Sequence, residues 1–242
     1  MKRQHIKWYS PHLQRHMDML VYGHSGKPVL FFPTRTARYY DYEDWNTLIK
    51  IEQRIDSGEF QLYCLDSVDA DGLYNKHLHP SLKIRKHLLY EAYVLDEVLR
   101  FVNLENPGYK PIVAGCSLGA WHAANLTFRH PHLFSHLLAM SGRYDLTMKL
   151  EFFEDLFDGY RDDDIYYHMP NWYIPNITDA TLLDQLRALH IVIVIGREDA
   201  FLPNNQHLNA ALLHIGVPHN FQIWEGEAHK ARYWAQMLEE YL

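Results

Sequence analysis

The chain has 242 residues, of which 48% are hydrophobic and 22% charged, and its formal net charge is −7 at pH 7. This composition is ordinary for a folded globular protein, and it argues against a disordered chain, a fibre or a disulfide scaffold. The sequence holds no long basic run that could neutralise phosphates, and no unbroken apolar stretch of the ~18 residues that cross a bilayer. We therefore expect neither a nucleic acid nor a membrane among its partners.

The start of the chain and its two cysteines indicate the expected compartment. Polar and aromatic residues follow Met1 without the apolar core of a secretory signal, and Cys64 and Cys116 lie in apolar runs typical of buried strands. These features favour a reduced, cytoplasmic environment, with a disulfide between the two thiols as the alternative. No repeat or Pro/Gly/Ser-rich linker marks a boundary, so we expect one domain over residues 1–242 and leave a homo-oligomer open.

Apolar and β-branched runs bounded by Gly, Pro, Asp or Asn predict seven short strands along the chain. They are Met17–Tyr22, Val29–Phe32, Phe60–Leu65, Ile112–Cys116, Leu137–Met140, Ile191–Ile195 and Phe221–Trp224. Segments with a helical period are Trp45–Ile55, Ser81–Val102, Ala210–Ile215 and Tyr233–Leu242. Strands that alternate with helices predict an α/β fold, with a mostly parallel central sheet covered by helices on both faces. In such a sheet, functional residues gather at the carboxyl ends of the strands.

One region, residues 146–175, interrupts this alternation. It contains the acidic runs Glu151–Asp155 and Arg161–Asp164 and a cluster of aromatic residues that includes Trp172. The region is too long for a simple connection between a strand and a helix. We expect a small, lid-like insertion over the active edge of the sheet, with a solvated surface excursion as the alternative.

A serine in a Gly-x-Ser-x-Gly pattern is the strongest candidate for a catalytic residue. The pattern, Gly115 to Gly119, directly follows a predicted strand and directly precedes a good helix start. In this context the serine sits on a strained turn that lifts its hydroxyl above the sheet, and the helix aims its first amides at developing negative charge. We predict Ser117 as the nucleophile and the N–H of Leu118 as one oxyanion donor. A purely structural helix entry is the alternative, and Cys116 is expected to pack beneath the turn.

An acid and a histidine follow the serine in the order that hydrolases of the α/β type use. The β-branched run Ile191–Ile195 ends in Gly-Arg-Glu-Asp, and we predict Asp199 as the acid, with the adjacent Glu198 as the alternative. His229 lies in the loop after the last predicted strand. A serine hydroxyl needs a base that is itself oriented by a carboxylate, so His229 is predicted as that base.

Taken in order, these residues resemble the "Putative esterase" branch of the α/β-hydrolase superfamily, which includes S-formylglutathione hydrolase (esterase D), feruloyl esterases and the antigen 85 mycolyltransferases. The other matching pieces are Val29–Thr34, Gln61–Asp69, His130–Phe134, Ser141-Gly142, Gly196-x-x-Asp199, and Tyr233-Trp234 after His229. The resemblance covers most of the chain. It implies an α/β-hydrolase fold and ester hydrolysis without a cofactor.

The same resemblance implies a second oxyanion donor in the loop after Val29–Phe32. The donor would be the backbone N–H of Arg35, with Thr36 as the near alternative. The loop of the family usually contains glycine, whereas this loop reads Pro-Thr-Arg-Thr-Ala-Arg over residues 33–38. This departure leaves the identity of the donor open.

Several side chains near the predicted active edge are candidates for substrate binding. They are Thr36, Arg38, Tyr39, Tyr74 and Trp172. Together with Arg35, the guanidinium of Arg38 could attract an anionic or sugar-bearing substrate, and the aromatic faces could stack on sugar rings or aromatic acyl groups. The alternatives are pairing of Arg35 and Arg38 with Asp41, Glu43 or Asp44, and ordinary packing of the aromatic rings.

The motif order predicts a serine hydrolase that cleaves small-molecule carboxylic esters through an acyl-enzyme on Ser117. An acyltransferase that passes the acyl group to an alcohol or sugar is one alternative, and a non-catalytic binding protein on the same fold is another. The pairs His77-x-His79 and His130-x-His132 lack a third ligand in a zinc spacing. We therefore expect no metal and no cofactor.

Overall fold

The computed structural model describes residues 1–150 and 152–242, and Glu151, which falls within the predicted insertion, lies outside the described residues. An eight-stranded sheet forms its centre, in the order β1-β2-β4-β3-β5-β6-β7-β8. The strands are β1 (Arg3–Ser10), β2 (Arg15–Tyr22), β3 (Lys27–Phe32), β4 (Phe60–Leu65), β5 (Ile112–Cys116), β6 (His136–Met140), β7 (His190–Gly196) and β8 (Asn220–Trp224). The pairs β1–β2 and β2–β4 are antiparallel, and the other five pairs are parallel. The predicted mostly parallel sheet is therefore confirmed.

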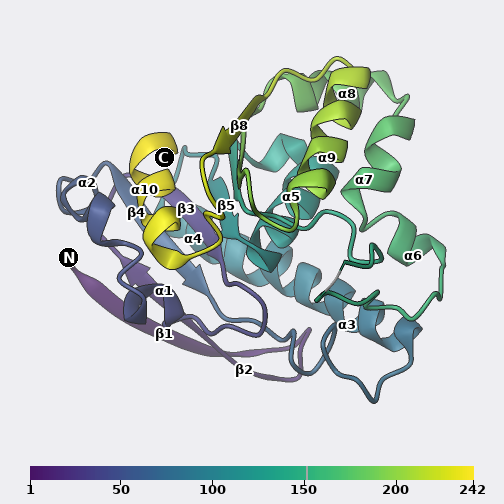
Figure 1. Ribbon diagram of the computed structural model, residues 1–242. Helices are drawn as coiled ribbons and strands as arrows, with labels where there is room; N and C mark the ends of the chain where they lie inside the picture. Colours follow the sequence, from purple (N-terminus) through teal and green to yellow (C-terminus); the bar gives the residue numbers. More distant parts are fainter. Residues whose placement is uncertain (151) are drawn as a thin grey trace.

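Helices cover both faces of this sheet (Figure 1). They are α1 (Asp41–Asp44), α2 (Glu52–Asp56), α3 (Pro80–Tyr93), α4 (Leu99–Glu105), α5 (Leu118–Arg129), α6 (Asp163–Tyr166), α7 (Pro170–Tyr173), α8 (Ala180–Arg187), α9 (Leu202–His214) and α10 (Ala231–Tyr241). One apolar cluster packs α3, α4, α5 and α9 on one face, and a second packs α1, α2 and α10 on the other. No helix in the described ranges is long and apolar enough to cross a membrane.

The structure extends the strand predictions by one edge strand that the sequence pattern did not reveal. Among the described residues β1 pairs with β2 alone, and most of its residues are exposed, so its sequence shows no apolar run. The seven predicted strands all occur. Cys64 and Cys116 both lie buried in them as free thiols.

Two helical predictions need correction. The segment predicted as one helix, Trp45–Ile55, forms a short 3₁₀ turn at Ile49–Ile51 followed by α2. Asn46 has a φ of 54°, a left-handed conformation that interrupts a helix at that point. The helix predicted at Ser81–Val102 instead runs through α3, a π-helical turn at Val94–Val98 and α4.

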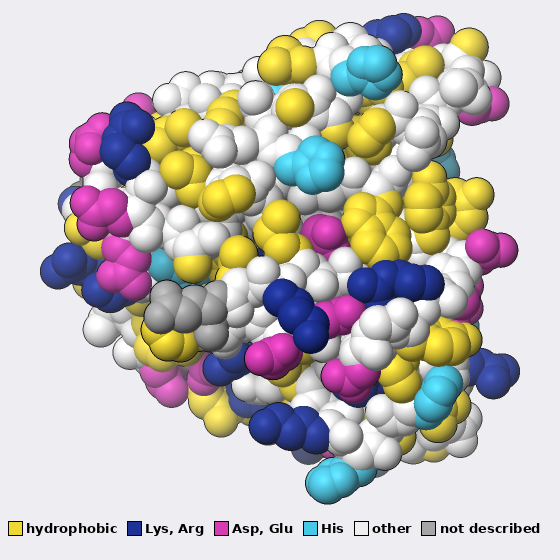
Figure 2. Space-filling model, turned by 45° about the vertical axis from the view of Figure 1, so that its right-hand side comes forward, with side chains coloured by type: hydrophobic (Ala, Val, Ile, Leu, Met, Phe, Trp, Pro, Cys, Tyr) yellow, Lys and Arg dark blue, Asp and Glu magenta, His cyan; other side chains and the backbone are white. Residues whose placement is uncertain are grey.

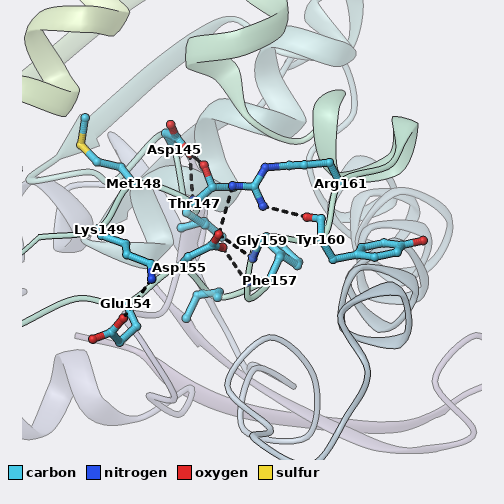
Figure 3. Close-up of polar contacts among 12 residues, drawn as sticks. Asp145, Thr147, Met148, Lys149, Glu154, Asp155, Phe157, Gly159, Tyr160 and Arg161 are labelled. Carbon is cyan, nitrogen blue, oxygen red and sulfur yellow. Dashed lines mark hydrogen bonds and ion pairs between the residues drawn. The ribbon is translucent and has the colours of Figure 1, made fainter.

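The connection from β6 to β7 contains the predicted insertion. Its apolar side chains, among them Phe157, Ile165 and Met169, pack against residues of α3 and α5 in a third apolar cluster. A tight loop within it is organised by Asp155, whose carboxylate accepts hydrogen bonds from the N–H groups of Phe157 and Gly159 and from Arg161 (Figure 3). The segment is thus held both by apolar packing and by the hydrogen bonds that the two oxygens of Asp155 accept.

Candidate active site

Ser117 lies at the turn between β5 and α5, in a backbone conformation that side-chain-bearing residues rarely adopt, with φ 56° and ψ −118°. Its N–H donates to the carbonyl oxygen of Met140 in β6 at 2.9 Å. A Cβ atom at Gly115 would lie 2.2 Å from the carbonyl oxygen of Gly119, and one at Gly119 would lie 2.3 Å from that of Phe32. The two glycines of the motif are therefore required by close backbone contacts on either side of the serine.

The residue between Gly115 and Ser117 packs beneath the turn, as predicted. Cys116 is fully buried, and its N–H donates to the hydroxyl of Tyr42, which in turn donates to the carbonyl oxygen of Phe32. Burial raises the pKa of the Cys116 thiol far above its usual range. The thiol is consequently neutral, and a neutral thiol is a poor nucleophile.

A hydrogen-bonded chain joins Ser117 to residues that follow β7 and β8. The Nε2 atom of His229 lies 3.1 Å from the Oγ atom of Ser117, and its Nδ1 atom lies 2.8 Å from an oxygen of Asp199. The second carboxylate oxygen of Asp199 accepts the N–H of Phe201 at 2.9 Å. Asp199 is buried and His229 is partly exposed, whereas Glu198 is exposed. Of the two acids considered, Asp199 is thus the one beside the imidazole.

The loops that carry the acid and the histidine pack directly on each other. A Cβ atom at Gly196 would lie 2.0 Å from the carbonyl oxygen of Glu227, so glycine is required where the two loops touch. The ring of Trp234 lies edge-on to the imidazole of His229 with 5.5 Å between centroids, and its Nε1 donates to Ser141. These contacts fix the plane of the imidazole from the side of α10.

The hydroxyl of Ser117 and the ring of His229 open onto a cavity of about 440 Å³. The described residues that line it are Thr34, Arg35, Tyr74, Ser117, Leu118, Arg143, Phe152, Phe153, Phe201, His229 and Trp234. Five of these lining residues have the aromatic side chain of Phe, Tyr or Trp, and none of these lining residues is Asp or Glu. The cavity therefore combines apolar walls with cationic groups.

The backbone amides of Leu118 and Arg35 are both oriented by local structure at this cavity. Leu118 is the first residue of α5, where an amide has no intrahelical acceptor. Arg35 lies in a turn closed by the hydrogen bond from the N–H of Ala37 to the carbonyl oxygen of Thr34, with Thr36 at a φ of 53°. Within the described ranges, neither the Leu118 nor the Arg35 N–H is engaged by a protein acceptor.

The structure places one of the five predicted substrate-binding side chains at the cavity and the other four elsewhere. Tyr74 lines the cavity, but Thr36, Arg38, Tyr39 and Trp172 are not among its lining residues. The guanidinium of Arg38 pairs in a bidentate manner with Asp66, not with the acids at positions 41–44. The ring of Tyr39 stacks on His5, and Trp172 donates to Asp145. Arg38, Tyr39 and Trp172 are thus used in pairing or packing outside the cavity, and Thr36 is exposed.

Arg143 is a cavity residue that no sequence pattern singled out. It follows the Ser141-Gly142 pair after β6, is only 3% exposed, and lines the same cavity as Ser117. Burial lowers the pKa of its guanidinium from the usual value, although arginine remains charged in proteins. Its position directly after a strand end was the available signal.

A buried polar cluster lies apart from this cavity, between α3, α5 and α7. His87, Glu91 and His168 place potential metal-ligand atoms within 4.8 Å of one another. Arg129 donates to the carboxylate of Glu91 and contacts the Nε2 atom of His168. Its guanidinium therefore balances the negative charge of Glu91. The sequence signal for this cluster is a histidine and a glutamate four residues apart on one helix. It differs from the His-x-His pairs in which a metal site was considered above.

Solved structures with the same fold include known esterases. The chain aligns with a ferulic acid esterase at a TM-score of 0.78 and 17% identity, covering 100% of this chain and 96% of that one. It aligns with an S-formylglutathione hydrolase from Agrobacterium tumefaciens at a TM-score of 0.75 and 11% identity, covering 98% and 92%. The fluorophosphonate-binding serine hydrolase FphF of Staphylococcus aureus gives 0.73 and 16%, covering 99% and 96%. A sequence search of curated proteins finds no match.

The family model described as "Putative esterase" matches residues 41–240. The chain belongs to this family. The predicted α/β-hydrolase fold and the resemblance to this esterase branch are both confirmed. As a member of the family, the chain is an esterase.

Proposed function

We propose that the chain hydrolyses carboxylic esters through a serine acyl-enzyme, with Ser117 as nucleophile, His229 as base and Asp199 as the acid that orients the base. The observation that carries this proposal is the continuous hydrogen-bond chain from Asp199 through His229 to Ser117 at the edge of a cavity. A positioned imidazole compensates for the weak nucleophilicity of a serine hydroxyl.

In the first half-reaction, the Oγ atom of Ser117 attacks the ester carbonyl while Nε2 of His229 takes its proton. Asp199 accepts the Nδ1–H of the ring and stabilises the imidazolium that forms. The imidazolium then protonates the leaving alcohol. Water attacks the acyl-enzyme in the second half-reaction, with the same imidazole as base, and the carboxylic acid is released.

The developing oxyanion is stabilised by the N–H groups of Leu118 and Arg35. Both are free of protein acceptors among the described residues and both flank the cavity next to the serine. A donor of this kind contributes about 3 kcal/mol to the lowering of the barrier. The side chain of Arg35 is not needed for that role, because the backbone amide makes the bond.

The proposal is tested by Ser117→Ala, assayed with 4-nitrophenyl acetate and by covalent labelling with a fluorophosphonate probe. We expect kcat to fall by roughly 10⁴-fold or more and the labelling to disappear, because loss of the nucleophile removes the acyl-enzyme route. Ser135→Ala is the matched control, since Ser135 precedes β6 at the opposite end of the strand and donates to a backbone carbonyl. Near-full activity of purified Ser117→Ala would overturn the assignment.

A further inference from the structure

Arg143 holds a buried positive charge at the wall of the cavity. Its Nη2 atom donates to three backbone carbonyl oxygens of the β6–β7 connection, those of Leu146, Met148 and Glu154. Its Nε atom is buried and has no hydrogen-bond partner among the described residues. The carbonyl oxygens orient the guanidinium but carry no formal charge that would neutralise it.

Two carboxylates near Arg143, Asp145 and Asp155, favour its charged form but are hydrogen-bonded elsewhere. Asp145 accepts from the N–H and hydroxyl of Thr147 and from the indole of Trp172. Asp155 is bound by its own loop and by Arg161 (Figure 3). No ion pair joins Arg143 to a carboxylate in the described part of the chain, in contrast to the bidentate pairing of Arg38.

A second guanidinium lines the same cavity. Arg35 lies with its Cζ atom 5.4 Å from the ring centroid of Tyr74, which also lines the cavity. Burial raises the pKa of Tyr74 to about 12, so this phenol is a neutral hydrogen-bond donor at physiological pH. The cavity thus presents two cationic side chains and, among its described lining residues, no anionic one.

Aromatic rings connect Arg143 to the proposed catalytic histidine. The Cζ atom of Arg143 lies 5.8 Å from the ring centroids of both Phe153 and Phe201. The ring of Phe201 lies 5.7 Å from that of His229, centroid to centroid. One ring therefore separates the buried guanidinium from the imidazole, and both side chains line the same cavity, where a short substrate can reach both.

We infer, building on the proposed ester hydrolysis, that the preferred substrates are esters that carry a carboxylate, bound by Arg143 with Arg35 at the cavity rim. A buried guanidinium without a counter-charge is costly, and a carboxylate that enters the cavity offsets that cost with charge-assisted hydrogen bonds. The apolar rings of Tyr74, Phe153 and Phe201 suit a hydrocarbon or aryl segment between the carboxylate and the ester.

This preference arises locally, because the whole-molecule charge opposes it. The net charge is −7, and on the face shown in Figure 2 the Lys and Arg side chains are interspersed with Asp and Glu. A negative protein does not attract anions by long-range steering. The preference should therefore depend on the two cavity arginines and not on surface charge in general.

The test compares two substrates that differ in one charge. The 4-nitrophenyl ester of glutaric acid carries a free carboxylate, and the 4-nitrophenyl ester of monomethyl glutarate is its neutral analogue. For the wild-type chain we expect kcat/KM to be at least tenfold higher for the charged ester. Arg143→Met should reduce this ratio at least tenfold, Arg143→Lys should reduce it less, and Arg35→Gln should reduce it a few-fold. Arg187→Met, which removes an exposed charge on α8, is the control and should keep the ratio.

Equal kcat/KM for the two esters in the wild-type chain would overturn the inference, as would an unchanged ratio in a folded Arg143→Met variant. If that variant does not fold, the wild-type and Arg35→Gln ratios decide. Calorimetric titration of Ser117→Ala with free glutarate separates the inference from the proposed function. Glutarate binding without turnover of either ester would contradict only the serine mechanism, and turnover without glutarate binding or charge preference would contradict only the anion site.

Discussion

At the scale of single residues, the choice between two adjacent acids illustrates what a structure adds to a motif. Asp199 and Glu198 are equivalent by position in the sequence, but only Asp199 turns its carboxylate toward Nδ1 of His229. The N–H of Phe201 holds that carboxylate in place. An oriented carboxylate fixes which ring nitrogen of the histidine carries the proton. The role proposed for Asp199 therefore depends on its contact with His229.

We accordingly predict that Asp199→Asn lowers kcat on 4-nitrophenyl acetate by about 10⁴-fold, because an amide in the place of the carboxylate favours the wrong imidazole tautomer. Glu198→Gln is the matched control and should stay within a few-fold of the wild-type rate, since Glu198 is exposed. Comparable losses in both variants, or a larger loss in Glu198→Gln, would contradict the assignment of the acid.

The sequence pointed to Ser117, Asp199 and His229, which the structure brings together, because each follows a strand whose apolar pattern is clear. It was not sufficient for Arg143, whose importance comes from three carbonyl contacts and a cavity that exist only in the folded chain. Arg38 was misjudged for a similar reason. Its partner, Asp66, lies 28 positions away and is brought close by the pairing of β3 with β4.

At the scale of elements, the active edge depends on backbone packing between β3 and the start of α5. Gly119 has no room for a side chain, because a Cβ atom there would lie 2.3 Å from the carbonyl oxygen of Phe32 and 2.6 Å from that of Pro33. The same close approach sets the distance between the amides of Leu118 and Arg35, which follow these two segments.

Gly119→Ala should therefore displace α5 from β3, lower the free energy of unfolding by about 1–3 kcal/mol and reduce esterase activity as well. Thermal unfolding followed by circular dichroism, together with kcat on 4-nitrophenyl acetate, measures both effects. Gly72→Ala is the control, because a Cβ atom there meets its nearest neighbours at an ordinary 3.4 Å. Equal stability of the two variants would contradict the packing argument.

The errors in predicting elements share a cause. β1 is mostly polar and exposed, and the ladder with β2 that supports it cannot be recognised from any local pattern. The segment Trp45–Ile55 has a helical period, but the left-handed Asn46 and the 3₁₀ turn break it. The strands covered on both faces were predicted well, because consecutive residues along them are apolar.

At the scale of the whole molecule, the buried cluster around His87 links folding to pH. His87 is enclosed by Trp121, His122 and His168, and neither of its ring nitrogens has a hydrogen-bond partner among the described residues. Burial lowers the pKa of His87 well below its ordinary value, and the neighbouring histidines lower it further. The folded chain therefore keeps this imidazole neutral over a range where the unfolded chain protonates it.

The pKa of Glu91, four residues further along α3, is also lowered in the folded chain, so its stability contribution has the same sign as that of His87. Burial opposes the ionisation of this carboxyl group, but the nearby imidazoles of His130 and His168 and the hydrogen-bonded guanidinium of Arg129 outweigh burial and lower the pKa of Glu91. Its contribution to stability is present above the unfolded-state pKa of about 4.3 and is lost only as the pH falls below that value. The two effects therefore act in separate pH windows.

Between pH 6.5 and pH 5, the unfolded chain binds a proton at position 87 that the folded chain does not, so stability should fall by up to about 1.4 kcal/mol per pH unit from this group alone. His87→Leu removes the group, and its free energy of unfolding from urea titrations should decline less steeply than that of the wild-type chain over the same window. His136, whose pKa burial also lowers, is present in both chains and cancels in the comparison. Parallel stability curves would show that position 87 does not couple folding to pH, whereas a difference that appears only below pH 4.5 would point to the carboxylate of Glu91 instead.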